Sequence, residues 1–366
     1  MRKYDNSELC LIWLDSFVGL EYKHKKELYN LINGKDGIKE LLVKGKDYIV
    51  STIGETEYNS LVGSANASYL SYVTDALCRR DITAVTIDSE DYPEKLRETD
   101  FAPLVLYAKG DLSLLNSECF AIVGSRKSLP IAIKTAENFT KALSNANFTL
   151  VTGIAEGIDE MVIRTAIDNG GKVISVLGGG FDNIYPATNK DLVERLAKES
   201  LVITEYPPEV VAKPYHFPIR NRIIAGLSVG TLIVSGGIKS GTQHTASYAV
   251  EYGRDLFAVP YGIGVPSGAG CNDLIKKGAI LADMPEDVLD FYDKSPKESK
   301  RIELSQAEIE IVNALKDGEL HVQKISSALG KQVYELTPII SMLEIKGVIN
   351  KNGVNVYGLA RNSREE

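Results

Sequence analysis

The sequence predicts an α/β protein built on a mostly parallel, doubly wound sheet, and three observations predict it. Short runs of apolar, β-branched residues recur at regular intervals between about residue 105 and residue 290. Helical stretches separate these runs, and several of the runs end in glycine. Strands that alternate with helices form parallel sheets with helices on both faces, which is the class expected here.

Each element of this core is marked by its own pattern. The expected strands are residues 120–123, 148–152, 172–177, 201–204, 230–234 and 256–259. The stretches between them carry apolar residues at three- and four-residue spacing, which is typical of amphipathic helices. The expected helices are residues 131–146, 159–169, 190–198 and 242–252. The core domain is therefore expected to span residues 109–290.

Residues 1–108 are expected to form a separate helical domain. Helical spacing marks residues 9–17, 23–32, 37–42, 47–51 and 55–78, followed by a strand at 83–87 and a turn at 93–96. The turn at residues 17–20 resembles that of a helix-hairpin-helix or SAM-like module, a class that touches DNA backbones. A plain helical bundle remains the alternative at this point.

The end of the chain is expected to hold a linker and a small domain. Residues 291–304 are rich in Lys, Glu, Ser and Pro, as linkers are. Residues 305–360 predict helices at 305–316, 322–329 and 334–346, then strands at 348–350 and 355–359 joined at Asn352-Gly353. Three helices followed by a hairpin are the winged-helix arrangement.

Composition narrows the class of protein. The formal net charge of −8 argues against a general nucleic-acid coat, but it permits a focused basic groove. The chain has no long apolar run and no signal-peptide core, and its four cysteines are far apart, so a reduced cytoplasmic protein is expected. The four histidines lack metal-ligand spacing, and neither a metal nor another cofactor is expected.

The segment KPYHFPIRNR, residues 213–222, is positively charged, although the chain as a whole is negatively charged. Lys213, Arg220 and Arg222 alternate with Tyr215 and Phe217, and no acidic residue interrupts them. Cations interleaved with aromatic rings suit a flexible polyanion whose bases can stack. Its two prolines predict a shaped loop. A solvated basic loop without a ligand remains the alternative.

Four strand ends carry glycine-rich turns that could bind phosphates. Glycine lets backbone N–H groups point at an anion, and a following helix N-terminus adds positive potential. The candidate phosphate-binding residues are Gly124, Ser125, Arg126, Gly153, Gly237, Lys239, Ser240 and Gly241, and a further glycine turn spans residues 178–180. The dinucleotide fingerprint and the ATPase phosphate loop are both absent, which argues against NAD binding and ATP hydrolysis.

Two carboxylates near these turns have structural interpretations. Asp159 follows the turn at Gly157 and is expected to cap the next helix. Glu205 follows a strand and is expected to orient a cation such as Arg220. Arg222, beside two isoleucines, is the cation expected to brace its own segment rather than to contact a ligand.

Together these motifs resemble the DprA/Smf family, the DNA-processing proteins of bacterial natural transformation. The resemblance covers about residues 104–282 and is most specific at HFPIRNRIIAGLS. The matching segments are 122–126 (IVGSR), 152–159 (TGIAEGID), 176–180 (VLGGG), 184–186 (IYP), 204–208 (TEYPP), 216–228 (HFPIRNRIIAGLS), 240–242 (SGT), 257–260 (FAVP) and 270–275 (GCNDLI).

The resemblance implies an extended Rossmann fold that binds single-stranded DNA, dimerises and loads a RecA-type recombinase, without catalytic turnover. It implies that Arg126 and the segment holding Lys213, Arg220, Asn221 and Arg222 contact DNA, with Phe217 or Tyr215 as a stacking surface. Two departures stand out. Glu156 places an acid in a phosphate turn, and polar residues replace apolar ones at positions 243 and 244, in a helix that relatives use to self-associate.

Two other functional classes remain open from the sequence. Residues 235–242 with Glu251 vaguely resemble the signature of nucleoside-monophosphate phosphoribohydrolases, although Glu251 is too far from Thr242 along the chain. A transcriptional regulator whose winged helix reads duplex DNA is the other class. The acidic Glu335 and Glu344 in its candidate recognition helix argue against that interpretation, because groove readers present Arg, Lys, Asn or Gln.

Overall fold

The computed structural model describes residues 2–17, 20–31, 37–294, 304–316 and 318–360, and these fall into two compact units, 1–295 and 296–366. Val18 and Gly19 of the turn that resembles a SAM-like module lie outside the described residues, as does most of the predicted linker. Among the described residues, no helix has the length and apolar character needed to cross a membrane.

A nine-stranded sheet forms the centre of the first unit, in the order β1-β2-β6-β5-β4-β3-β7-β8-β9. Seven neighbouring strands, β6-β5-β4-β3-β7-β8-β9, run parallel to one another. Strand β2 pairs antiparallel with both β1 and β6. The predicted α/β class is confirmed. The strands are β1 (Thr83–Thr86), β2 (Val105–Gly110), β3 (Cys119–Val123), β4 (Thr149–Thr152), β5 (Val173–Val176), β6 (Leu201–Thr204), β7 (Gly230–Ile233), β8 (Asp255–Ala258) and β9 (Ile280–Leu281).

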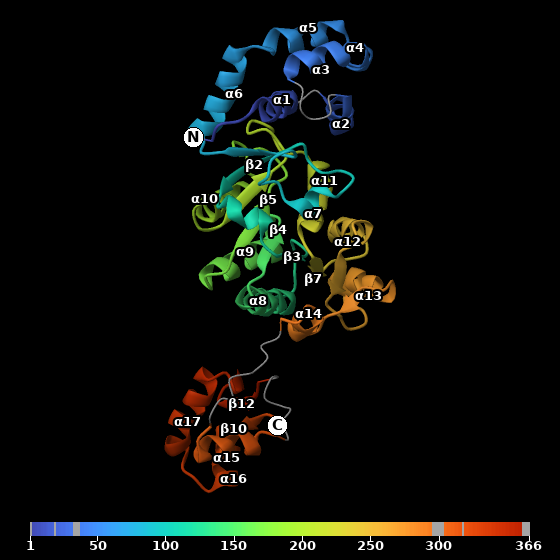
Figure 1. The fold of residues 1–366 in the computed structure, drawn as a ribbon. Coiled ribbons are helices and arrows are strands. Elements are labelled where there is room, and N and C mark those ends of the chain that lie inside the picture. The colour runs from blue at the N-terminus through green and yellow to red at the C-terminus, as the bar shows by residue number, and fades with distance from the viewer. Residues whose placement is uncertain (1, 18–19, 32–36, 295–303, 317, 361–366) are drawn as a thin grey trace. The chain divides into compact units, whose positions relative to one another are not determined.

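Helices cover both faces of this sheet (Figure 1). The two faces are built from alternating strand residues: Phe120 and Ile122 of β3 pack in one core cluster, Ala121 and Val123 in the other. On the first face lie α8 (Pro130–Asn145), α9 (Ile158–Asp168), α10 (Lys190–Glu199) and α14 (Glu286–Phe291); on the second lie α7 (Glu94–Arg97), α11 (His216–Leu227), α12 (Thr242–Glu251) and α13 (Ala269–Lys276).

Helix α11 corrects the expectation that residues 213–222 form a loop. The helix begins at His216 and carries the predicted basic residues from Arg220 onward. Pro218 does not prevent it, because the first turn of a helix has backbone N–H groups without intrahelical partners, so a proline there removes no hydrogen bond. The predicted turn at 93–96 likewise overlaps the short helix α7, which runs from Glu94 to Arg97.

The N-terminal helices, α1 to α6, which we call the helical front, belong to the same compact unit as the sheet and share a hydrophobic core with it. The buried centre of the helical front includes Trp13 and Leu28, which share a core cluster with Val85 of β1 and Leu106 of β2. The predicted helix at 55–78 is divided by Asn66, whose side chain accepts a hydrogen bond from the backbone nitrogen of Tyr69 and caps the second piece. The helices are α1 (Asn6–Asp15), α2 (Tyr22–Leu31), α3 (Ile38–Lys44), α4 (Lys46–Ile53), α5 (Glu55–Ser64) and α6 (Ala67–Arg79).

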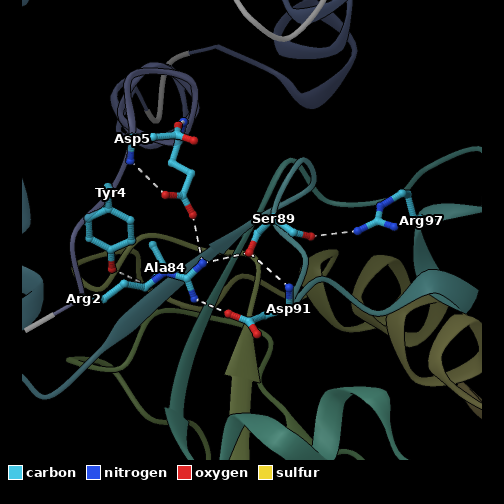
Figure 2. A network of polar contacts seen from close by, with 8 residues as sticks. Arg2, Tyr4, Asp5, Ala84, Ser89, Asp91 and Arg97 are labelled. Atoms are coloured by element: carbon cyan, nitrogen blue, oxygen red, sulfur yellow. Dashed lines mark hydrogen bonds and ion pairs between the residues drawn. The ribbon is translucent and has the colours of Figure 1, made fainter.

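A polar network ties the first residues of the chain to the edge of the sheet (Figure 2). Arg2 donates to Asp91 at 2.7 Å, to Glu8 at 2.9 Å and to Ser89 at 2.8 Å. The backbone nitrogen of Ala84 in β1 donates to the hydroxyl of Tyr4 at 3.0 Å. The predicted domain boundary at residue 108 falls inside β2, and the predicted domain division stays a prediction.

The second unit has a hydrophobic core of its own, which includes Ile311, Leu336 and Leu343. Its described residues, 304–316 and 318–360, form three helices and a three-stranded antiparallel sheet in the order β10-β12-β11. The hairpin turns at residues 354–355 rather than at Asn352-Gly353, because β11 continues to Gly353. The elements are α15 (Gln306–Ala314), β10 (Leu320–His321), α16 (Val322–Leu329), α17 (Val333–Ile345), β11 (Ile349–Gly353) and β12 (Val356–Leu359), and their assignment as a winged helix stays a prediction.

Candidate functional site

The four glycine turns meet at one edge of the sheet. They follow β5, β4, β3 and β7, which are neighbours and parallel, so their carboxyl ends lie side by side. The chain order reverses between β3 and β7, and such a switch point opens a crevice where ligands bind in α/β sheets. A cleft of about 760 Å³ lies at this edge.

The cleft brings together eight of the fourteen predicted site residues. They come from the turn after β3, from α11 and from the turn between β7 and α12. The eight are Gly124, Ser125, Arg126, Phe217, Arg220, Asn221, Ser240 and Gly241. The remaining six, which are not part of its lining, are Gly153, Lys213, Tyr215, Arg222, Gly237 and Lys239. Lys213, Tyr215 and Lys239 are exposed nonetheless.

Hydroxyl groups join the two turns that flank the switch point. The backbone nitrogen of Ser125 donates to Oγ of Ser235 at 3.2 Å, and Oγ of Ser128 lies 2.9 Å from the same atom. Asn221 of α11 donates to the carbonyl oxygen of Gly241 at 3.3 Å. These bonds hold the turn after β3, the turn after β7 and α11 in one arrangement around the cleft.

Sequence reasoning missed two residues that contribute most to the character of the cleft. Lys127, beside Arg126, lines it and is exposed. Tyr185, from the loop between β5 and α10, lines it as well, and its ring lies 5.6 Å from that of Phe217. Tyr185 belongs to the IYP segment, residues 184–186, which matches the family and could have marked it as a candidate site residue.

Arg126 rests on an aromatic ring. Its guanidinium carbon lies 5.4 Å from the centroid of the Phe217 ring, within the range of a cation–π contact. Arg126 and Lys127 are both exposed, so the rim of the cleft is positively charged in a chain whose net charge is −8. The cleft therefore combines cations and aromatic rings, which is the chemistry that binds an unpaired nucleic-acid strand.

Arg220 lies in the floor of the cleft and is 4% exposed. Its guanidinium donates to the carbonyl oxygen of Val176 at the end of β5 and faces the buried Asp159. Both groups fill the space over Gly153, where a Cβ atom would lie 2.5 Å from Oδ2 of Asp159 and 2.7 Å from a nitrogen of Arg220. Gly153 thus has a packing reason to be glycine, and its phosphate contact stays a prediction.

The expectation that Asp159 caps α9 is wrong. The residue before the helix is Gly157, and no side chain caps this end. The Asp159 carboxylate instead accepts from the backbone nitrogens of Ala155 and Gly124. Burial raises the pKa of Asp159, while Arg220 and these N–H groups act in the opposite direction. Burial also lowers the pKa of Arg220.

Glu205 orients Arg222 rather than Arg220. Two nitrogens of Arg222 donate to the two carboxylate oxygens of Glu205 at 3.1 and 2.6 Å, and the two side chains are 5% and 11% exposed. The guanidinium also lies 5.7 Å from the ring centroid of Tyr22 in α2. The geometry agrees with the bracing role expected for Arg222 and leaves its predicted DNA contact a prediction.

His216 is fixed at the start of α11. Its ring stacks on Tyr206 with centroids 4.2 Å apart, and its Nδ1 lies 3.1 Å from the carbonyl oxygen of Gly178. Burial lowers the pKa of His216, because the charged imidazolium loses hydration there. The side chain of Glu156 is exposed and accepts from Oγ1 of Thr188 at 3.3 Å.

Glu251 does not reach this cleft. It closes α12 at the end opposite Thr242 and lines a different hollow, with Asp100 and Arg254 among its neighbours. A helix of ten residues is about 15 Å long. The glutamate that a phosphoribohydrolase would need near the start of α12 is therefore at the wrong end.

Known proteins similar to this chain share its core. Residues 83–293 match the family model described as DNA recombination-mediator protein A. The DNA processing protein DprA of Bacillus subtilis is 38% identical over 219 residues, covering 60% of this chain and 74% of that protein. DprA of Streptococcus pneumoniae is 41% identical over 198 residues, covering 54% and 70%.

Solved structures agree with this match. The X-ray structure of DprA from Streptococcus pneumoniae superposes with a TM-score of 0.67 at 31% identity, covering 79% of this chain and 98% of that one. A DprA structure from Helicobacter pylori, described for its single-stranded DNA binding mode, gives 0.53 at 25% identity and covers 58% and 96%. The matched core, the strand-end cleft and the motifs around it show that this chain belongs to the DprA/Smf family of DNA recombination-mediator proteins.

Proposed function

We propose that this protein binds single-stranded DNA in the cleft at the strand ends. The observation that carries the proposal is the pairing of exposed cations, Arg126 and Lys127, with the rings of Phe217 and Tyr185 around one hollow of about 760 Å³. The Helicobacter pylori relative is described as binding single-stranded DNA, which supports the same ligand here.

The strand would lie along the edge formed by the glycine turns. Arg126 and Lys127 would contact phosphates at the cleft, and Lys213 and Lys239, both exposed, would extend the positive path beyond it. Arg220, in the floor, would contribute positive potential from below rather than an exposed contact, because it is 4% exposed. Unpaired bases can stack on rings and paired bases cannot, so a single strand should bind more tightly than a duplex.

The bound strand would be passed to a recombinase of the RecA type, and the protein would act as a homodimer during DNA processing in transformation. Family membership supports both partners. The four cysteines are unpaired thiols, three of them buried, which fits the reducing cytoplasm where such a recombinase works. No step in this proposal requires turnover of a substrate or a cofactor.

The test is a fluorescence anisotropy titration with labelled oligo-dT and a matched duplex at two salt concentrations. If about four phosphates are neutralised, the logarithm of the association constant should fall with the logarithm of salt at a slope of roughly −3. Arg126→Glu and Lys213→Glu should each weaken binding and flatten this slope. Lys198→Glu is the matched control. Lys198 is exposed near the end of α10, just before β6 begins, so it lies at the amino ends of the strands, away from the cleft at their carboxyl ends.

A preference for the duplex, or an affinity that does not change with salt, would contradict the proposal. Sedimentation of the wild-type protein over a range of concentrations would test the dimer separately. A protein that stays monomeric at every concentration would remove the homodimer and leave the DNA site unaffected.

A further inference from the structure

The sequence singles out two rings for base stacking, Phe217 and Tyr215. Tyr215 does not line the cleft, and Phe217 lines it but already contacts other residues of the protein. Phe217 packs against the turn after β5 so closely that a Cβ atom on Gly178 would lie 2.9 Å from its Cδ1. The guanidinium of Arg126 lies over the ring, and Tyr185 contacts it from a third direction, with the two ring planes inclined by 55°. Phe217 still lines the cleft, but these neighbours cover part of its ring, so a base that stacks on it would compete with them.

Tyr185 is placed differently. It is 54% exposed, although it contacts Phe217 and lines the cleft. It also borders a smaller hollow of about 80 Å³ that it shares with Arg126 and Phe217. An exposed ring at the rim of a cationic cleft offers a free face for stacking, and stacking on such a face tolerates any base.

The loop that carries Tyr185 is held in place before any ligand arrives. Gly180, at its start, lies against backbone, since a Cβ atom there would be 2.2 Å from the carbonyl oxygen of Pro207. Asn183 donates to the carbonyl oxygen of Glu209 at 2.9 Å, and the buried Asn189 donates to that of Ile154 at 2.9 Å. A ring held in this way loses little conformational freedom on binding, which favours affinity.

We propose that Tyr185 is the base-stacking residue of the cleft and that Phe217 is a positioning residue that holds both Tyr185 and Arg126. The inference rests on the proposed function and assigns its base contact to a residue outside the motif HFPIRNR. A guanidinium stacked on a ring keeps its N–H groups free at its edge, so Arg126 can hold a phosphate while Tyr185 holds the neighbouring base.

A thermodynamic cycle between protein and DNA tests the assignment. Wild type and Tyr185→Ala are titrated with labelled oligo-dT and with an oligonucleotide of the same length in which every residue is abasic. Removing the ring should weaken binding of oligo-dT by between roughly fivefold and 150-fold, the range for one stacked base. Binding of the abasic strand should not change, because that strand has no base to stack.

Three further variants separate the roles. Tyr185→Phe keeps the ring and should bind both strands as the wild type does. Phe217→Leu should weaken binding of both strands, since Arg126 loses the ring it rests on. The matched control is Tyr72→Ala, which removes an exposed tyrosine from α6, outside the cleft, and should bind as the wild type does.

The outcomes distinguish the inference from the function on which it rests. A wild-type protein that binds neither strand would overturn both. Wild-type binding of oligo-dT that Tyr185→Ala leaves unchanged, or that it weakens equally for the abasic strand, would overturn the stacking role alone. A loss of oligo-dT binding in Phe217→Leu that spares the abasic strand would return the base contact to Phe217.

Discussion

The two buried arginines of α11 lie two residues apart and serve opposite sides of the helix. Positions i and i+2 of a helix point in nearly opposite directions. Arg220 therefore faces the strand ends and Asp159, while Arg222 faces Glu205 and Tyr22 of the helical front. One side supports the floor of the cleft, and the other joins the sheet to α2.

The ion pair of Arg222 gives a prediction about stability. Arg222→Leu leaves the largely buried Glu205 carboxylate without its partner and should lower the free energy of unfolding by about 3–5 kcal/mol. Glu205→Met combined with Arg222→Leu removes both charges and should recover most of that loss. Urea denaturation of the wild type, the two single variants and the double variant measures it. A double variant as unstable as the sum of its single changes would show that the two groups do not interact.

His216 gives a prediction about pH. Its pKa is lowered in the folded protein, so between that value and the ordinary 6.5 the unfolded chain binds more protons than the folded one. Its contribution to stability is therefore present above about pH 6.5 and is lost as pH falls through the folded pKa. The wild type should lose stability from pH 7.5 to 5.5 relative to His216→Asn, which does not titrate, by at most about 1.4 kcal/mol per pH unit. Parallel slopes for the two proteins would contradict this.

At the scale of elements, close packing at Gly180 fixes the position of the loop between β5 and α10, and a substitution there tests this packing. Gly180→Ala would force a methyl group into the backbone oxygens of Pro207 and Pro208, which cannot move aside as a side chain could. We expect a loss of about 1–3 kcal/mol in the free energy of unfolding, together with weaker binding of oligo-dT. Gly262→Ala, in a loop with open space around it, is the control. Equal melting temperatures for the two variants would contradict the expected strain.

The elements show what the sequence could and could not predict. The six strands predicted for the core domain are confirmed to within one residue at each end, because a strand buried on both faces has a continuous run of apolar, β-branched residues. Helix α11 was missed because two prolines and two aromatic residues near its start are typical of a loop. Their positions relative to the helix start decide the outcome, and the pattern does not fix that start.

The candidate site was predictable in its chemistry but less so in its geometry. The glycine turns and Arg126 were found, since parallel strands place their ends together. Arg220 and Arg222 look alike in the sequence, and their burial depends on Asp159 and Glu205, which come from other elements. Tyr185 was missed as a site residue because a single tyrosine in a turn forms no periodic pattern.

At the scale of the whole molecule, the two units predict separable behaviour. Each has its own hydrophobic core, and the cleft belongs entirely to the first. A protein ending at Ser295 should therefore bind oligo-dT as the full chain does. A separate fragment of residues 296–366 should unfold in a single cooperative transition. Anisotropy and thermal melting check the two statements. A large loss of affinity in the shorter protein would show that the second unit contributes to the site.

The contacts of Arg2 also have a consequence for the order of synthesis on the ribosome. Its partner Glu8 is 6 residues away, but its partners Ser89 and Asp91 are 87 and 89 residues away. At roughly 5–20 residues per second, several seconds separate the emergence of Arg2 from that of Asp91. The first helices must therefore leave the ribosome before β1 and the turn after it, which holds Ser89 and Asp91. A chaperone that binds nascent chains would find these helices with their sheet-facing side uncovered.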